Sequence, residues 1–119
     1  MSPMMNLITI IRDSLKTSGI PVKARLPDES TPEPFIVIGT HFEDDSQSGK
    51  TGKVTTTELQ IDLFYAIDNR AELEDAIYEI KILIYNSTQQ ITRVTSNAIT
   101  DDDIGRDVFH VIFLVSAYL

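Results

Sequence analysis

The sequence lacks cysteine altogether and is short of basic residues and long apolar runs. With no Cys among its 119 residues, disulfides and thiolate metal sites are excluded, and a reducing compartment fits the chain. No apolar stretch reaches the ~18 residues of a membrane span. The N-terminus also lacks the pattern of a signal peptide. These absences predict a protein that is made in the cytoplasm and has no membrane partner.

Basic charge is the second shortage. Ten Lys and Arg are scattered among eighteen Asp and Glu, which gives a net charge of −8. Neutralising phosphates requires clustered cations, so specific nucleic-acid binding is not expected. An acidic surface would instead suit a protein past which DNA must move without sticking.

What is present predicts one globular domain over residues 1–119. Hydrophobic residues make up 42% of the chain and charged residues 24%, the balance of a folded domain rather than a disordered chain. The expected class is α/β (α+β), with a mixed or antiparallel sheet flanked by two helices, in the order α-β-β-β-α-β-β. The predicted elements are a helix at 3–18, strands at 20–26, 35–42 and 54–66, a helix at 70–86, and strands at 91–100 and 108–119.

Local signals place the ends of the two helices. Ser2 followed by Pro3 predicts the N-cap and first position of the first helix, and Gly19 predicts its C-terminal end. Asn69 and Glu72 stand three apart, which predicts a capping box at the start of the second helix. The strands at 35–43 and 54–66 are expected to pair with each other.

The tripeptide Gly49-Lys50-Thr51 looks like the end of a nucleotide-binding P-loop. A P-loop requires an earlier glycine and a following helix, so that backbone amides surround the phosphates. Here Asp44 holds the glycine position, and the segment after Thr51 is a predicted strand. The sequence therefore predicts a polar loop and no nucleotide site.

Other chemistry-bearing residues also fail to form a predicted active site. Asp101, Asp102 and Asp103 precede Gly105, but the calcium-loop spacing is missing, so a solvated turn is expected. His41 and His110 both fall in predicted strands, and no Cys or Gly-x-Ser-x-Gly nucleophile accompanies them. A catalytic histidine pair stays open as the minor alternative. The main expectation is a protein that is not an enzyme and has no cofactor and no metal.

Two apolar surfaces exceed what a single buried face requires. The second helix carries one stripe for the core and a second stripe of Tyr78, Ile82 and Tyr85. Tyrosines are favoured at protein interfaces, so the second stripe predicts contact with another subunit. Cover by the first helix or by a loop is the alternative. The last predicted strand is apolar on both faces, so it also requires a second covering layer.

Five segments together suggest a known family, namely LKTSGIPVKARLP, PEPFIVIG, GKTGKVTTTELQIDLFY, NRAELEDAIYEIKILI and DVFHVIFLVSAYL. Through them the chain resembles the tail-terminator, or tail-completion and tail-to-head joining, proteins of long-tailed bacteriophages. The resemblance covers nearly the whole chain, and no catalytic motif contributes to it.

The resemblance implies a non-enzymatic virion protein that forms a ring, commonly of six subunits, on the end of the tail tube. Such a ring ends tube polymerisation and provides the head-joining surface. The implied partners are other copies of this chain, the tail-tube protein and a head-completion or connector protein. DNA would pass the lumen without specific binding. The implied location is the virion, at the head–tail interface.

The expected subunit or partner contacts are the second stripe and residues of the polar loop. The latter are Glu43, Asp44, Asp45, Lys50 and Lys53, and the two aspartates are also candidates for the lumen. Alternative functions are a phage neck or head–tail connector protein, a small cytoplasmic ligand-binding domain or enzyme, and a bacterial adaptor or toxin-system partner. A ligand-binding domain would show a pocket with convergent polar groups near His41 or His110.

Overall fold

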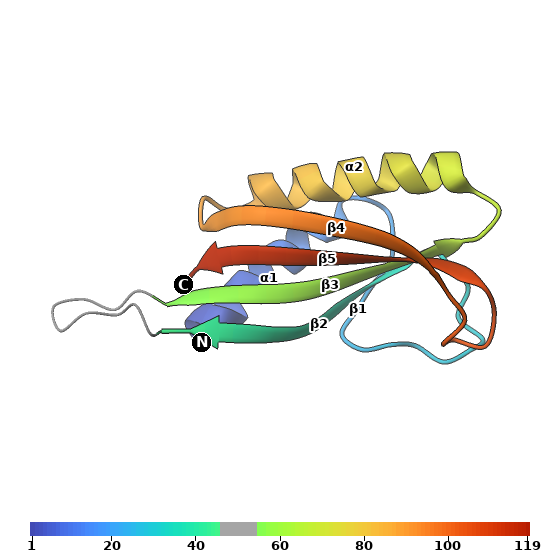
Figure 1. The fold of residues 1–119 in the computed structure, drawn as a ribbon. Coiled ribbons are helices and arrows are strands. Elements are labelled where there is room, and N and C mark those ends of the chain that lie inside the picture. The colour runs from blue at the N-terminus through green and yellow to red at the C-terminus, as the bar shows by residue number, and fades with distance from the viewer. Residues whose placement is uncertain (46–54) are drawn as a thin grey trace, which may run out of the picture.

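Two helices lie on one face of a five-stranded sheet in the computed structural model, which describes residues 1–45 and 55–119 (Figure 1). This is the predicted fold class, and the order of elements is also the predicted one. The elements are α1 (Pro3–Lys16), β1 (Val22–Lys23), β2 (Phe35–Asp44), β3 (Thr56–Ala66), α2 (Arg70–Ser87), β4 (Ile91–Asp101) and β5 (Val108–Tyr118).

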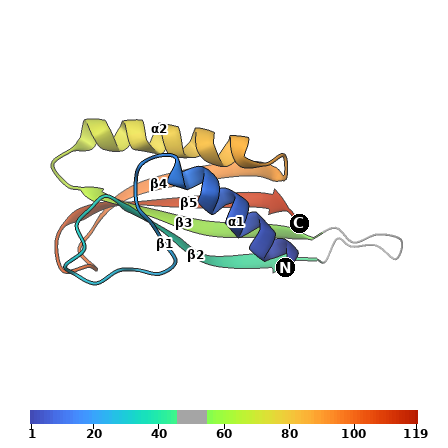
Figure 2. The same cartoon turned by 180° about the vertical axis from the view of Figure 1, so that it is seen from behind.

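The sheet is mixed, with the strand order β1-β2-β3-β5-β4. β2 pairs with β3, β3 with β5, and β5 with β4, all antiparallel, whereas the short β1 runs parallel to β2. The predicted pairing of the strands that became β2 and β3 is therefore confirmed. α2 runs along the β4 side of the sheet, and α1 crosses the other half (Figures 1 and 2). Within the described residues, β4 is a long edge strand at the opposite side from β1.

α1 forms where the local signals predicted it, but it is shorter. The Ser2 hydroxyl accepts a 3.1 Å hydrogen bond from Met5 N–H, and Pro3 occupies the first turn. The helix ends at Lys16 rather than at residue 18. After it, the N–H groups of residues 17 to 19 bond to carbonyls three residues back, and Gly19 turns the chain with a φ of 81°. The positive φ favours glycine there.

The predicted capping box of the second helix is wrong. Asn69 is the N-cap of α2, but its side chain makes no capping hydrogen bond. Glu72 instead accepts a 3.3 Å hydrogen bond from the Tyr65 hydroxyl at the end of β3. The Tyr65 hydroxyl thus competes with the backbone N–H of Asn69, the capping-box partner, for the Glu72 carboxylate. The spacing of Asn69 and Glu72 in the sequence does not reveal that competition.

Several strand boundaries also differ from the prediction. β1 has only two residues instead of residues 20–26. β2 continues to Asp44, so Glu43 and Asp44 belong to a strand and not to a loop, and they pair with Thr57 and Thr56. Their polarity suggested a loop because an edge region of a sheet can be polar on both faces. β3 begins at Thr56 rather than at 54, β4 continues to Asp101, and β5 ends at Tyr118.

The core lies between the helices and the sheet. α1 contributes four buried side chains, and α2 contributes Leu73, Ala76, Ile80 and Ile84. Phe113 of β5 lies in the same layer and is fully buried. A second, smaller cluster fills one end of the opposite face, and its members are Phe35, Val37, Phe64, Ile104 and Val108.

The rest of the opposite face has no covering helix among the described residues. Leu114 of β5 is half-buried there beside Gln60 and Thr95, its partners on β3 and β4. Phe42 of β2 is 67% exposed. The prediction that β5 is apolar on both faces is confirmed, and its second face is only partly covered.

Candidate functional site

The second apolar stripe of α2 is exposed. Tyr78 is 70% exposed, Ile82 42% and Tyr85 46%. They are spaced i, i+4 and i+7, so they share one face of the helix. Among the described residues neither α1 nor a loop covers this face, which excludes the alternative of cover within the monomer there. An interface role for the three residues remains a prediction.

The stripe ends at the edge strand β4. The Tyr85 hydroxyl accepts a 2.9 Å hydrogen bond from Val94 N–H. A strand at the edge of a sheet exposes unpaired backbone groups that can pair with another chain. Tyr85 satisfies one such group, so it has a structural role in addition to its exposure. The aromatic stripe and the β4 edge thus form one continuous surface.

The other predicted contact residues lie elsewhere. Glu43 and Asp44 are at the end of β2, which β3 and β5 separate from β4 and the stripe. Glu43 lies 3.3 Å from His41 Nε2, and Asp45 follows the strand. Lys50 and Lys53 lie outside the described residues. The structure therefore does not bring the acidic residues and the stripe together, and an interface role for either group stays a prediction.

The two histidines occupy opposite faces of the sheet. His41 pairs with Leu59 and His110 with Phe64. These partners are five positions apart on β3, an odd spacing that puts them on opposite faces, roughly 17 Å apart along the strand. The predicted strand positions are confirmed, and the geometry excludes a catalytic pair formed by these two side chains.

His110 lies between two carboxylates and against an aromatic ring. Its Nε2 is 2.7 Å from Asp62 Oδ1, and its Nδ1 is 2.9 Å from Asp101 Oδ2. Its ring stacks on Phe64, with the ring centroids 4.4 Å apart. Asp62 also accepts a hydrogen bond from the Gln60 amide. The cluster joins β3, β5 and the end of β4 on the face opposite the helices.

This arrangement changes the protonation of the cluster. Burial alone would lower the pKa of His110, but hydrogen bonds to Asp62 and Asp101, together with their charges, raise it above its usual value. The pKa of Asp101 is lowered, first by the hydrogen bond from Asp103 N–H and then by His110. Because ionised carboxylates only accept hydrogen bonds, the imidazolium, which donates from both ring nitrogens, is the form of His110 that bonds both carboxylates.

The cluster is poorly suited to catalysis. The cluster itself lines a cavity of about 220 Å³, whose polar lining is Gln60, Asp62, Asp101, Asp103 and His110. The convergent polar groups expected of a ligand-binding domain near His110 are therefore present, but the cavity is smaller than the ~300–1,000 Å³ typical of ligand sites. Both ring nitrogens of His110 already have carboxylate partners. The imidazole therefore has no free lone pair with which to accept a proton from a substrate. Its role in the described structure is to bridge strands.

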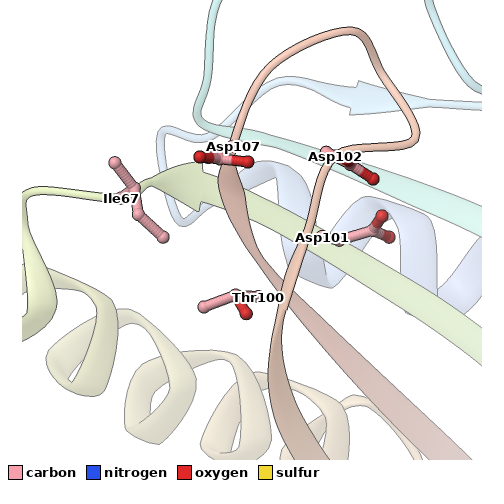
Figure 3. A pocket seen from close by; sticks show the side chains of 5 residues that line it. All are labelled: Ile67, Thr100, Asp101, Asp102 and Asp107. Atoms are coloured by element: carbon pink, nitrogen blue, oxygen red, sulfur yellow. The ribbon is translucent and has the colours of Figure 1, made fainter.

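Acidic residues at the end of β4 and in the turn that follows it line a second hollow, shown in Figure 3. It measures about 510 Å³ and is lined by Ile67, Thr100, Asp101, Asp102 and Asp107. Carboxylate oxygens of Asp101, Asp102 and Asp103 lie within 4.8 Å of one another. Asp101 is already bonded to His110 and to Asp103 N–H. Exposed acidic groups of this kind are common without a metal, and they are not assigned one here.

Arg106 links the turn 102–107 to the loop between β1 and β2 by an ion pair and hydrogen bonds. Its Nε lies 2.6 Å from Glu33 Oε1, and its two terminal nitrogens donate to the carbonyls of Glu29 and Thr31. Neither this contact nor the His110 cluster is predicted from the sequence. Asp62 gave no local signal, because it occupies a polar position of the β3 alternation together with Glu58 and Gln60.

Replacing Arg106 with Ala is expected to lower the free energy of unfolding by about 2 kcal/mol, because Glu33 and two carbonyls lose charge-assisted hydrogen bonds. Urea unfolding would measure this loss, and faster tryptic cleavage at Arg25 would report loosening of the loop. Arg93→Ala, at an exposed position on β4, is the matched control and should change stability by less than ~0.5 kcal/mol. Equal effects of the two substitutions would contradict the assigned role.

The fold and these sites define a two-layer α+β domain with exposed contact surfaces and a strand-bridging histidine cluster.

No protein-family model matches the chain, and no curated protein matches its sequence significantly. A chain of a solved structure described as "Virion of native gene transfer agent (GTA) particle" has a similar fold, with a TM-score of 0.54. The match covers 95% of this chain and 92% of that chain at 11% identity. At this identity the similarity shows a shared fold. Neither described helix is long and apolar enough to cross a membrane.

Proposed function

We propose that this chain is a structural protein of a phage or phage-like virion, and that it acts as a tail terminator. It would form a ring on the end of the tail tube, stop the addition of tube subunits and present the surface that joins the head. The ring would assemble from copies of this chain and contact the tube protein on one side and a head-completion protein on the other. Its mechanism is binding, with no reaction catalysed.

The observation that carries this proposal is the fold shared with a chain of a gene transfer agent virion over 95% of the present chain. The exposed aromatic stripe of α2 and the partly covered sheet face add independent support, because a protein that works by assembly requires such surfaces. Both ring nitrogens of His110 are engaged, which disfavours the ligand-binding or enzyme alternative. The net charge of −8 suits a lumen that DNA crosses without binding.

Inactivating the gene in the particle-producing genome that encodes it tests the proposal. We expect DNA-filled heads, unattached tails and tubes of uncontrolled length in electron micrographs. Wild-type protein should restore joined particles, whereas Tyr78→Glu with Ile82→Glu should reduce their number about 30-fold or more, as for loss of an interface hot spot. Ile67→Glu, at an apolar position that is 41% exposed, is the control and should restore them.

The same micrographs distinguish the alternatives. Tubes of normal length that fail to join heads would favour a neck or connector protein over a terminator. Normal joined particles in the absence of the protein would contradict a virion role altogether. The variant proteins should keep the wild-type circular dichroism spectrum, so that loss of assembly is not loss of folding.

A further inference from the structure

A groove lies between α1 and the β1–β2 side of the sheet, at the opposite edge from β4. Its volume is about 460 Å³, within the ~300–1,000 Å³ range of sites that bind large side chains or ligands. Its apolar lining includes Met5 and Ile8 from α1 and Ile38 from β2. The groove is therefore large and apolar enough to hold side chains from another molecule.

Three cations and no acidic residue line this groove. They are Arg12 and Lys16 from α1 and Lys23 from β1. In a chain of net charge −8 that has only ten basic residues, this is a local reversal of the overall sign. The Arg12 Nε is buried and has no hydrogen-bond partner among the described residues, although Asp13 Oδ1 lies 3.8 Å from it. The groove is thus suited to an occupant that combines apolar side chains with carboxylates.

The stripe of α2 has that composition. Tyr78 and Ile82 are the exposed apolar side chains, and Asp75 and Glu79 lie beside them, both exposed. Asp75 is three positions before Tyr78, and Glu79 is three before Ile82, so each carboxylate is a neighbour of an apolar residue on the helix surface. Glu74 and Lys81 also flank the stripe, and Glu74 is already paired with Arg70 at 3.3 Å.

The groove and the stripe lie at opposite sides of the molecule. α2 runs along the β4 side, and α1 and β1 form the other side (Figure 2). They cannot meet within one copy. When the stripe of one copy binds the groove of a second copy, the pair still has one free groove and one free stripe. Further copies can therefore add head to tail, and the chain of copies closes into a ring when the rotation between neighbours allows.

We propose that the α2 stripe of one copy binds in the α1–β1 groove of the next copy. Tyr78 and Ile82 fill the apolar part of the groove, and Asp75 and Glu79 face Lys16, Lys23 and Arg12. This assigns the subunit contact of the proposed ring and rests on that proposed function. The occupant is a second copy of this chain, because its α2 supplies both the apolar side chains and the opposite charge.

Two charge-reversal variants test the contact by light scattering. One carries Lys16→Glu and Lys23→Glu in the groove, and the other carries Asp75→Lys and Glu79→Lys beside the stripe. Each alone should dissociate at least ~10-fold more readily than wild type, because like charges then meet at the contact. An equimolar mixture should recover the assembly, since each altered patch meets a complementary patch on the other variant. Asp68→Lys, an exposed reversal in the turn before α2 and outside both patches, should assemble as wild type does.

Three results would overturn the proposal. Wild-type assembly by the groove variant, with loss only in the stripe variant, would mean that the stripe binds elsewhere. Failure of the mixture to recover would mean that the two patches do not meet. A wild type that stays monomeric at every concentration would exclude this contact in solution. The gene-inactivation experiment would still decide the virion role in each case, so the two failures are distinguishable.

Discussion

Replacing His110 with Leu is expected to lower the free energy of unfolding by about 3 kcal/mol, because two carboxylates on one face of the sheet lose their common cationic partner. Asp62 is only 9% exposed, so water cannot fully solvate its carboxylate after the histidine is removed. The remaining hydrogen bond from Gln60 keeps the expected loss at the lower end of the range for broken buried ion pairs. Denaturant unfolding at neutral pH would measure it.

The other histidine provides a matched control. His41 is exposed and lies 3.3 Å from the exposed carboxylate of Glu43, so His41→Leu should change stability by less than ~0.5 kcal/mol. Replacing Asp62 and His110 together with Leu should recover part of the loss, because no carboxylate is then left unpaired at that position. A His110→Leu variant as stable as His41→Leu would contradict the bridging role.

The same cluster predicts a dependence of stability on pH. The pKa of His110 in the folded protein lies above its usual value of 6.5. A raised histidine pKa means that its contribution is fully present below the unfolded pKa, near 6.5, and is lost as the pH rises through the folded pKa. Wild type should therefore lose stability over that interval, as measured by thermal unfolding at a series of pH values. His110→Leu should lack this part of the decline.

Replacing Phe113 with Ala is expected to lower the free energy of unfolding by about 4 kcal/mol, because the residue is fully buried between the sheet and the helices. The next residue gives the contrast. Leu114 faces the other side of the sheet and is only half-buried, so Leu114→Ala should cost about 1 kcal/mol in the monomer.

Urea unfolding of both variants over a dilution series tests whether one face of β5 is covered within the subunit and the other is open. The Phe113→Ala loss should not depend on protein concentration, because its surroundings lie within one copy. The Leu114→Ala loss should grow with concentration if another subunit covers the open face. Equal losses at every concentration would contradict the assignment of one covered and one open face.

The sequence was sufficient for the features that depend on local pattern. Ser2 and Pro3 predicted the start of α1, and the spacing of Tyr78, Ile82 and Tyr85 predicted an additional apolar face on α2. Alternation predicted β3 and its pairing with β2. Each of these follows from one stretch of chain whose residues share a face or a turn, so no distant contact is required to predict it.

What the sequence did not reveal depends on contacts between distant segments. Asp62, Asp101 and His110 come from three strands, and their convergence follows from the register of β3, β5 and β4. Arg106 meets the loop near Glu33 for the same reason. Glu72 is bonded by Tyr65 across the β3–α2 connection, which displaced the predicted capping box. Local spacing cannot rank such competing partners.

The α1–β1 groove is a further example. Arg12 and Lys16 lie on a helix and Lys23 lies on a short edge strand, so in the sequence they are scattered basic residues. Only the packing of α1 against the sheet brings them together beside Ile38. The overall acidity of the chain thus conceals a local basic patch.

Measuring the solution mass by light scattering over a dilution series tests the proposed ring most directly. For this ring, the mass should rise with concentration to a closed species and stop there, near 80 kDa for six copies of the 13.4 kDa chain. A mass that stays at 13.4 kDa at every concentration, with no ring on purified tail tubes, would contradict it.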